Sequence, residues 1–279
     1  MPHIMEMLGT TRVTVKDGQV IDVGKPRIRW CPLFDKVHGI KEITGDAVRT
    51  NMEFRIAELG MFTPARDLDV DVFVNFGASE VMMTGLERGL IETTITACDG
   101  AGTVITDNPG LVQGMGAQIS GLIETEPIPE IIEGIRERGG VVVDEDAASI
   151  DPVAGLRRAA QLGYRRIAVT VIDPGVALEI RRLESELGIK TIVIAAHITA
   201  LSRSEIEDLL ELVDIITGCA SKHVRSLVKP LAQVGTAIPL FALTQAGKEL
   251  LIERAKEIRT PVLINTMPLP VLPEQKQPV

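Results

Sequence analysis

The chain begins with alternating apolar and polar positions on both sides of an Asp-Gly pair. The alternating segments are TRVTV (11–15) and QVIDV (19–23). Because Asp-Gly favours the type I′ turn that joins two antiparallel strands, Asp17-Gly18 predicts a β-hairpin. A third strand is predicted at 26–30 and ends at Cys31. The helical spacing of apolar residues at 45–60 predicts a helix.

From residue 71 onward, short apolar segments alternate with amphipathic ones. The apolar segments predict strands at 71–77, 92–98, 141–145, 165–172, 190–197, 214–219, 237–243 and 261–266. The amphipathic segments predict helices at 79–89, 109–121, 128–140, 153–163, 175–188, 205–213, 221–231 and 245–258. Asp151 and Pro152 are typical of an N-cap and a first helical position, and Ser202 or Ser204 is predicted to cap a later helix.

This alternation predicts the α/β class: a mostly parallel sheet with helices on both faces, preceded by an N-terminal β-hairpin and helix. The chain divides accordingly into four regions. They are an N-terminal hairpin and helix extension (1–70), a first α/β half (71–150), a second α/β half (151–267) and a loose Pro-rich tail (268–279).

Composition narrows the class of protein. The 279 residues are 45% apolar and 24% charged, which suits one large globular α/β domain or two smaller ones. The net charge of −9 argues against nucleic acid as a partner. The sequence shows no signal peptide and no apolar run long enough to span a membrane. Three cysteines, far apart and odd in number, suit a reducing cytoplasm.

Cysteine and histidine recur where predicted strands end. Cys98, His197 and Cys219 each end a predicted strand of the sheet. Since ligands bind outside the carboxyl ends of parallel strands, these three side chains are expected at one edge. With Cys31, the cysteines form a candidate metal set for an iron–sulfur cluster with one iron left open. Alternatively Cys98 is a nucleophile with Asp99 as an acid–base group, or the cysteines are small buried hydrophobes.

Glycine-rich junctions suggest a small anionic ligand. In CDGAGT (98–103), Gly100 and Gly102 either allow a tight turn or bring backbone N–H groups to a phosphate or carboxylate. Asp107 follows as a turn residue or a ligand contact. At a second junction, Gly77 and Ser79 suggest either a helix cap or an anion site.

A third polar group surrounds Cys219. Ser221 and Lys222 follow it directly, and Lys222 is either a charge for an anionic ligand or a solvated helix start. His197 is a candidate orienting group for the same ligand.

Several stretches together resemble the methanogenesis marker protein 8 family. They are DGQVIDVG, CPLF, FGASE, CDGAGTVITDNP, LVQGMGA, GYRRIAVTV and CASK, spread in the same order over roughly residues 10–255. The resemblance implies a cytoplasmic archaeal protein connected to methanogenesis or its cofactor metabolism. Family cysteines match Cys31, Cys98 and Cys219, but a further cysteine frequent in the family is replaced by Phe62.

Three functions follow as alternatives. The first is an enzyme or maturation factor that binds an iron–sulfur cluster or small anionic ligand through the cysteine-bearing edge. The second is a non-catalytic assembly protein whose partner is a methanogenesis enzyme or cofactor. The third is a nucleotide- or deazaflavin-binding protein that uses the CDGAGT loop. A homo-oligomer is compatible with each of them.

Overall fold

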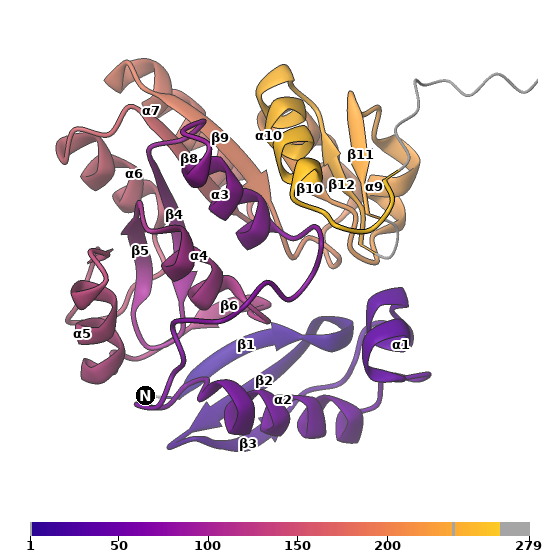
Figure 1. The fold of residues 1–279 in the computed structure, drawn as a ribbon. Helices are drawn as coiled ribbons and strands as arrows, with labels where there is room; N and C mark the ends of the chain where they lie inside the picture. Colours follow the sequence, from indigo (N-terminus) through magenta and orange to yellow (C-terminus); the bar gives the residue numbers. More distant parts are fainter. Residues whose placement is uncertain (1, 236–237, 263–279) are drawn as a thin grey trace, which may run out of the picture.

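The computed structural model describes residues 2–235 and 238–262, which form two β-sheets and the helices that cover them (Figure 1). The smaller sheet has the order β3-β2-β1-β6 and the larger β11-β12-β10-β9-β8-β4-β5-β7. The strands of the smaller sheet are β1 (His3–Met7), β2 (Thr11–Lys16), β3 (Gln19–Val23) and β6 (Gly121–Glu124). Those of the larger are β4 (Thr93–Cys98), β5 (Gly102–Thr106), β7 (Val141–Val142), β8 (Arg166–Val171), β9 (Lys190–Ala195), β10 (Ile215–Thr217), β11 (Ala232–Val234) and β12 (Leu240–Ala242).

The larger sheet is parallel at its centre and antiparallel at both edges. β10, β9, β8 and β4 run parallel to one another, whereas β5 and β7 on one side and β12 and β11 on the other pair antiparallel. The fold is therefore mixed α/β, and the predicted parallel character holds only for the central strands. Those strands bring their carboxyl ends to one edge of the sheet.

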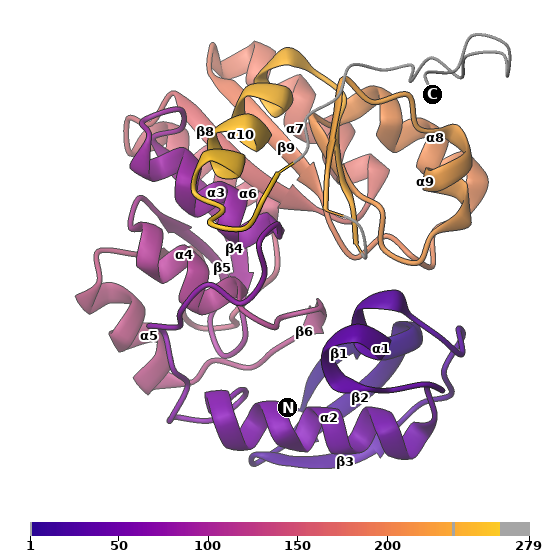
Figure 2. The same cartoon turned by 45° about the vertical axis from the view of Figure 1, so that its right-hand side comes forward.

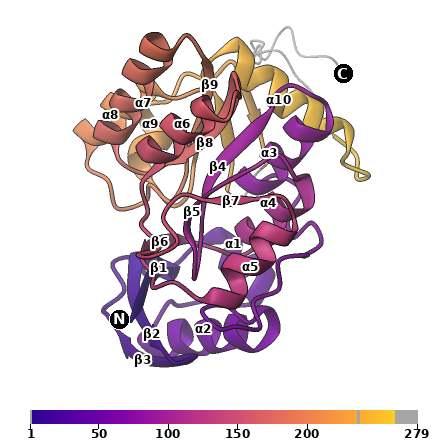
Figure 3. The same ribbon diagram turned by 90° about the vertical axis from the view of Figure 1, so that its left-hand side faces the viewer.

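Helices cover both faces of the larger sheet, as predicted (Figure 3). Along β8, Ile167 and Val169 pack in the cluster of α6 (Pro152–Gln161), α7 (Pro174–Leu187) and α8 (Arg203–Leu212). Ala168 between them joins the opposite cluster, formed with α3 (Ala78–Glu87) and α10 (Gln245–Lys256). Because both faces are buried, the strand is apolar on both sides from Ile167 to Val169. The other helices after residue 70 are α4 (Pro109–Gly116), α5 (Pro129–Glu137) and α9 (Lys222–Leu227).

The smaller sheet carries the predicted hairpin, with helix α2 (Gly45–Leu59) packed against β2 and β3 (Figure 2). Asp17 and Gly18 have φ of 50° and 70°, as the type I′ turn requires. A 3₁₀ turn (Leu8–Thr10) follows β1, and a short helix α1 (Pro32–His38) follows Cys31. The sheet takes its fourth strand, β6, from residues beyond position 70, because β6 pairs with β1.

Two predicted helix caps are confirmed. Asp151 caps α6 by accepting a hydrogen bond from the Ala154 N–H, with Pro152 at the first helical position. Ser202 caps α8 in a capping box with Glu205. These local signals work because a side-chain oxygen satisfies an orphan backbone N–H wherever the helix lies.

Some predicted elements are wrong. Residues 26–30 are not a strand, because Arg27 and Ile28 donate their backbone N–H groups to Gly9 across a loop. Residues 71–77 form no strand either: Val72 and Phe73 are exposed, and the segment is an irregular connection to α3. The helix predicted at 109–121 ends at Gly116, and β6 begins at Gly121. Most of the strand predicted at 261–266 lies outside the described residues.

Among the described helices, none is long and apolar enough to cross a bilayer.

Candidate functional site

The CDGAGT loop is a hairpin turn between two strands, and not the predicted passage from strand to helix. Cys98 pairs with Gly102 across antiparallel β4 and β5, and Gly100 and Gly102 both have positive φ. The Gly100 N–H donates to Thr125 Oγ1 at 2.7 Å. A Cβ on Gly102 would lie 2.2 Å from the Ala148 carbonyl oxygen. The two glycines therefore serve packing, and this turn offers no open backbone cradle for a phosphate.

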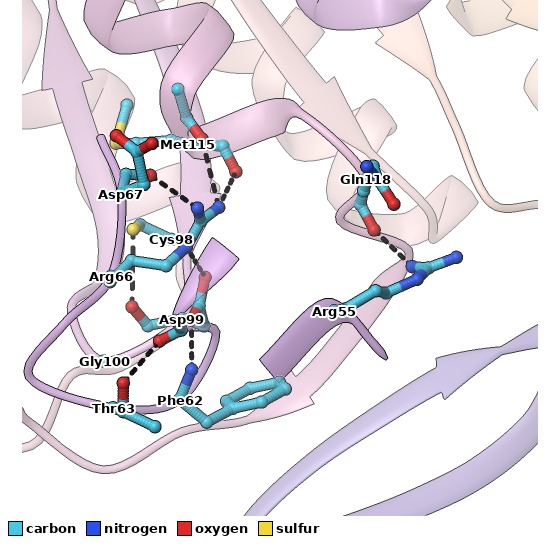
Figure 4. Close-up of polar contacts among 12 residues, drawn as sticks. Arg55, Phe62, Thr63, Arg66, Asp67, Cys98, Asp99, Gly100, Met115 and Gln118 are labelled. Atoms are coloured by element: carbon cyan, nitrogen blue, oxygen red, sulfur yellow. Dashed lines mark hydrogen bonds and ion pairs between the residues drawn. The ribbon is translucent and has the colours of Figure 1, made fainter. Parts of the chain in front are cut away.

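Asp99 in this turn belongs to a buried ion-pair network (Figure 4). Its Oδ1 accepts from Arg66 Nε at 2.9 Å and its Oδ2 from the Phe62 N–H at 2.7 Å. Arg66 also donates to the carbonyls of Gly114 and Met115. Both charged side chains are fully buried. Both carboxylate oxygens of Asp99 accept hydrogen bonds from other groups of the same chain. Asp99 is therefore a structural group and not the acid–base group expected.

Cys98 is buried with Leu111 and Ile131 in the cluster beneath α4 and α5. Its Sγ donates to the Asp99 carbonyl at 3.3 Å. Burial raises the pKa of the Cys98 thiol, and the Asp99 charge raises it further. The protonated thiol is a poor nucleophile and a poor metal ligand.

The described structure does not bring the three cysteines together. Cys31, Cys98 and Cys219 pack with three different hydrophobic clusters. Residues 2–235 and 238–262 contain no group of three or more His, Cys, Asp or Glu side chains placed to hold a metal ion. Strand ends do meet at one edge, but Cys98, the last residue of β4, is fully buried in the cluster beneath α4 and α5.

That edge instead forms one wall of a cleft of about 1470 Å³. Thr96 of β4, Thr170 of β8, His197 after β9 and Cys219 after β10 line it. The opposite wall comes from the unit of the smaller sheet, including Met7, Thr10, Cys31 and Arg55. In Figure 1 this unit lies beneath the larger sheet, facing the same edge. The cleft thus lies where an α/β sheet offers convergent loops.

The structure brings some predicted site residues to the cleft and leaves others away from it. Cys31, Gly77, Ser79, His197 and Cys219 line it. The residues outside its lining are Cys98, Asp99, Gly100, Gly102, Asp107, Ser221 and Lys222. Asp107 lies at the far end of the β4–β5 hairpin and accepts from the Tyr164 hydroxyl. Ser221 caps α9, and Lys222 is an exposed first residue of that helix.

The anion site predicted at Gly77 and Ser79 already contains a carboxylate. The N-cap of α3 is Gly77, not Ser79. The buried Glu80 accepts from the Ser79 hydroxyl at 3.0 Å and from the Val74 N–H at 3.3 Å. A Cβ on Gly77 would lie 2.2 Å from Glu80 Oε2, so the glycine makes room for this carboxylate. The Glu80 carboxylate therefore already compensates the positive N-terminal end of α3.

Arg55 of α2 supplies the cleft with a buried positive charge. Nε donates to Asn51 Oδ1 at 3.0 Å, and Nη1 donates to the Gln118 carbonyl and, at 3.3 Å, to Ser120 Oγ. In the described part of the chain no carboxylate pairs with it, and Nη2 has no hydrogen-bond partner. Burial lowers the pKa of Arg55 to about 10. Burial, and next the charge of Arg55, lower the pKa of His38 at the cleft.

The chain matches a family described as "Uncharacterized protein conserved in archaea (DUF2099)" over residues 3–256. It belongs to this archaeal family. The uncharacterised protein MJ0054 of Methanocaldococcus jannaschii is 45% identical over 273 residues, covering 97% of this chain and 96% of that one.

This DUF2099 member concentrates its unusual backbone conformations at the cleft. Among the described residues, seven other than glycine have positive φ, and four of these line the cleft. They are Thr10, Gln118, His197 and Cys219. Such conformations cost free energy and persist where packing holds them, most often at functional sites.

Sequence reasoning about this DUF2099 chain missed Arg55, although a signal was present. Val48, Met52 and Leu59 form the buried stripe of α2, and position 55 falls on the same stripe. A charged residue at an apolar position of a predicted helix indicates either a paired core charge or a ligand contact. The sequence could not tell which, because Asn51 and Gln118, its actual partners, carry no charge.

Proposed function

We propose that the cleft binds an organic anion whose charged group contacts Arg55. The observation that carries the proposal is a buried guanidinium at the cleft, 3% exposed, without a carboxylate partner in the described chain. Burying a charge is costly unless an opposite charge or full hydrogen bonding compensates it. An anionic ligand at Nη2 would supply the missing partner. Arg favours carboxylate and phosphate because its planar fork binds two oxygens at once.

The rest of the cleft suits a ligand with a sizeable apolar part. Its volume of about 1470 Å³ far exceeds one phosphate or carboxylate group. Phe73, Leu231 and Ile252 line it and are exposed, as are Pro261 and Val262. Cofactor sites have this composition, mostly apolar walls with a few placed polar groups. We therefore infer a cofactor-sized amphipathic anion, a class that includes nucleotides and deazaflavins.

The resemblance to the methanogenesis marker protein 8 family supports the same class. It implies cofactor metabolism or enzyme maturation in methanogenesis, and an organic anion fits either role. The iron–sulfur alternative gains no support from the positions of the cysteines.

Thermal unfolding of the full chain tests this proposal. The probes are inorganic phosphate, ATP and a deazaflavin, each compared with chloride at equal ionic strength. A ligand that favours the folded state raises Tm with concentration. We expect at least one probe to raise Tm of the wild type and to lose that effect in Arg55→Gln.

The matched control is Arg49→Gln, which removes the same charge from the same helix outside the cleft. This variant should keep the full ligand-induced rise in Tm. The proposal fails if no probe raises Tm, or if Arg55→Gln and Arg49→Gln respond to the probes equally.

A further inference from the structure

Glu6 and His197 form a contact that joins the two walls of the cleft. Glu6 lies on β1 of the smaller sheet, and His197 follows β9 of the larger one. Glu6 Oε2 lies 3.3 Å from His197 Nε2. The hydrogen bond from His197 lowers the pKa of Glu6, so this carboxyl group stays ionised. An ionised carboxylate accepts, which assigns the proton of the neutral imidazole to Nε2.

The fold holds the imidazole in place on two further sides. His197 has φ of 56°, a conformation that few non-glycine residues adopt. Gly121 of β6 packs directly on the ring: a Cβ there would lie 2.2 Å from His197 Cδ2 and 2.5 Å from Nε2. Position 121 therefore has to be glycine for the ring to reach Glu6. The strained backbone of His197 and the glycine that leaves room for its ring both indicate that the orientation of this side chain is important.

The other ring nitrogen is left unused by the chain. His197 lines the cleft, and Nδ1 makes no hydrogen bond within the described residues. With the proton on Nε2, Nδ1 carries a lone pair. The hydroxyl-bearing Thr170 and Thr199 line the same wall. An imidazole fixed by a carboxylate through one nitrogen, with the other nitrogen unpaired in a residue that lines a ligand site, is the arrangement used in general acid–base catalysis.

We propose that His197 is the acid–base group of the cleft and that Glu6 is its positioning residue. Nδ1 takes a proton from an acidic X–H bond of the bound organic anion, and the bonding pair stays on X. Glu6 stabilises the imidazolium that results, and the proton returns to the ligand at the same or another atom. This step needs no oxidant, reductant or second substrate. It rests on the proposed function, because the proton donor is the ligand bound there.

The first test is the protonation state of the ring in the full chain. NMR of protein labelled with ¹⁵N-histidine distinguishes the two neutral tautomers, and His197→Gln identifies the His197 signals among those of the four histidines. We expect the Nε2–H tautomer. The Nδ1–H tautomer would overturn the proposal, because Nδ1 then holds no lone pair for the ligand.

The second test is the reactivity of that nitrogen toward diethyl pyrocarbonate, followed by peptide mapping. We expect His197 to react faster than His223, a half-buried histidine outside the cleft lining. Glu6→Gln keeps an oxygen that accepts from Nε2 but removes the charge, so the His197 rate should fall about tenfold. Arg12→Gln, which removes an exposed cation beside Glu6, should leave the rate close to the wild-type value.

A purely structural contact predicts otherwise. In that case Glu6→Gln would leave the His197 rate unchanged, or His197 would react no faster than His223, and either result overturns the proposal. The Tm measurements separate this failure from that of the proposed function. A ligand-induced rise in Tm with an unreactive His197 leaves anion binding and removes proton transfer. A reactive His197 with no Tm response overturns the bound anion as proton donor.

Discussion

Arg55 and Arg66 are both buried arginines, but the chain surrounds them differently. Arg66 pairs with Asp99 and also donates to three backbone carbonyls. Arg55 contacts only neutral acceptors and leaves Nη2 free within the described residues. Figure 4 shows both side chains, with Arg66 inside the network around Asp99 and Arg55 apart from it, reaching Gln118. Burial by itself therefore does not identify a functional charge; the completeness of its partners does.

The largest expected effect breaks the complete network. Asp99→Asn keeps the size of the side chain but leaves the Arg66 charge buried without compensation. We expect the free energy of unfolding, measured by urea denaturation, to fall by about 3–5 kcal/mol. Arg136→Gln, which removes an exposed ion pair with Glu145, should leave it almost unchanged because solvent screens such a pair. Equal effects of the two substitutions would contradict a structural role for Asp99.

A smaller loss is expected where Gly121 meets His197. Gly121→Ala inserts a methyl group within 2.2 Å of the imidazole ring, so the ring or β6 has to move. We expect the free energy of unfolding to fall by about 1–3 kcal/mol. We also expect His197 in this variant to react with diethyl pyrocarbonate as slowly as it does in Glu6→Gln. Gly45→Ala, at an open position of α2, should be nearly neutral. A stable Gly121→Ala variant with wild-type His197 reactivity would show that the ring is not held there.

Replacing Arg55 should cost less than replacing Arg66. In buffer without phosphate, Arg55→Met relieves the burial of an uncompensated charge but loses hydrogen bonds to Asn51 and Gln118. These effects oppose each other, and we expect a net change below about 1 kcal/mol in the free energy of unfolding. Arg66→Met leaves Asp99 uncompensated and should cost about 3–5 kcal/mol. Denaturation of both variants checks the difference, and a similar loss in each would remove the distinction between the two arginines.

The smallest effect is a change in pH dependence at Glu6. Its pKa is lowered in the folded state, chiefly by the hydrogen bond from His197, so the unfolded chain binds its proton more readily. The stabilisation is therefore present above the ordinary carboxyl pKa and is lost as pH falls through the lowered value. Glu6→Gln should be less stable than the wild type near neutral pH and equal to it in acid. A stability difference between Glu6→Gln and the wild type that does not change with pH would contradict the lowered pKa of Glu6.

Local signals were sufficient to predict much of the fold. Asp17-Gly18, Asp151-Pro152 and Ser202 each act on neighbouring backbone, so their turn and caps appear as predicted. Pairing between distant segments was not accessible in the same way. β1 and β6 lie far apart in the sequence and form one ladder, and the apolar alternation at 71–77 has no partner strand. Tertiary pairing decides such strands.

The location of the candidate site was predicted better than the residues that line it. His197 and Cys219 do lie at the carboxyl edge, because parallel strands align their ends. Cys98 does not face the cleft, since β4 turns back as a hairpin and its last side chain points into the layer. Arg55 and Glu6 were missed because each is recognised as a site residue by a contact with a residue more than 60 positions away in the sequence.

The return of the chain to build β6 also determines how the two walls can move. The backbone passes between the walls three times: after α2, before β6 and after β6. A wall attached at several points cannot swing freely as it could on a single hinge. Molecules therefore enter through an aperture whose width is largely built into the backbone. Exchange of a tight occupant is then governed by side-chain motion at the rim.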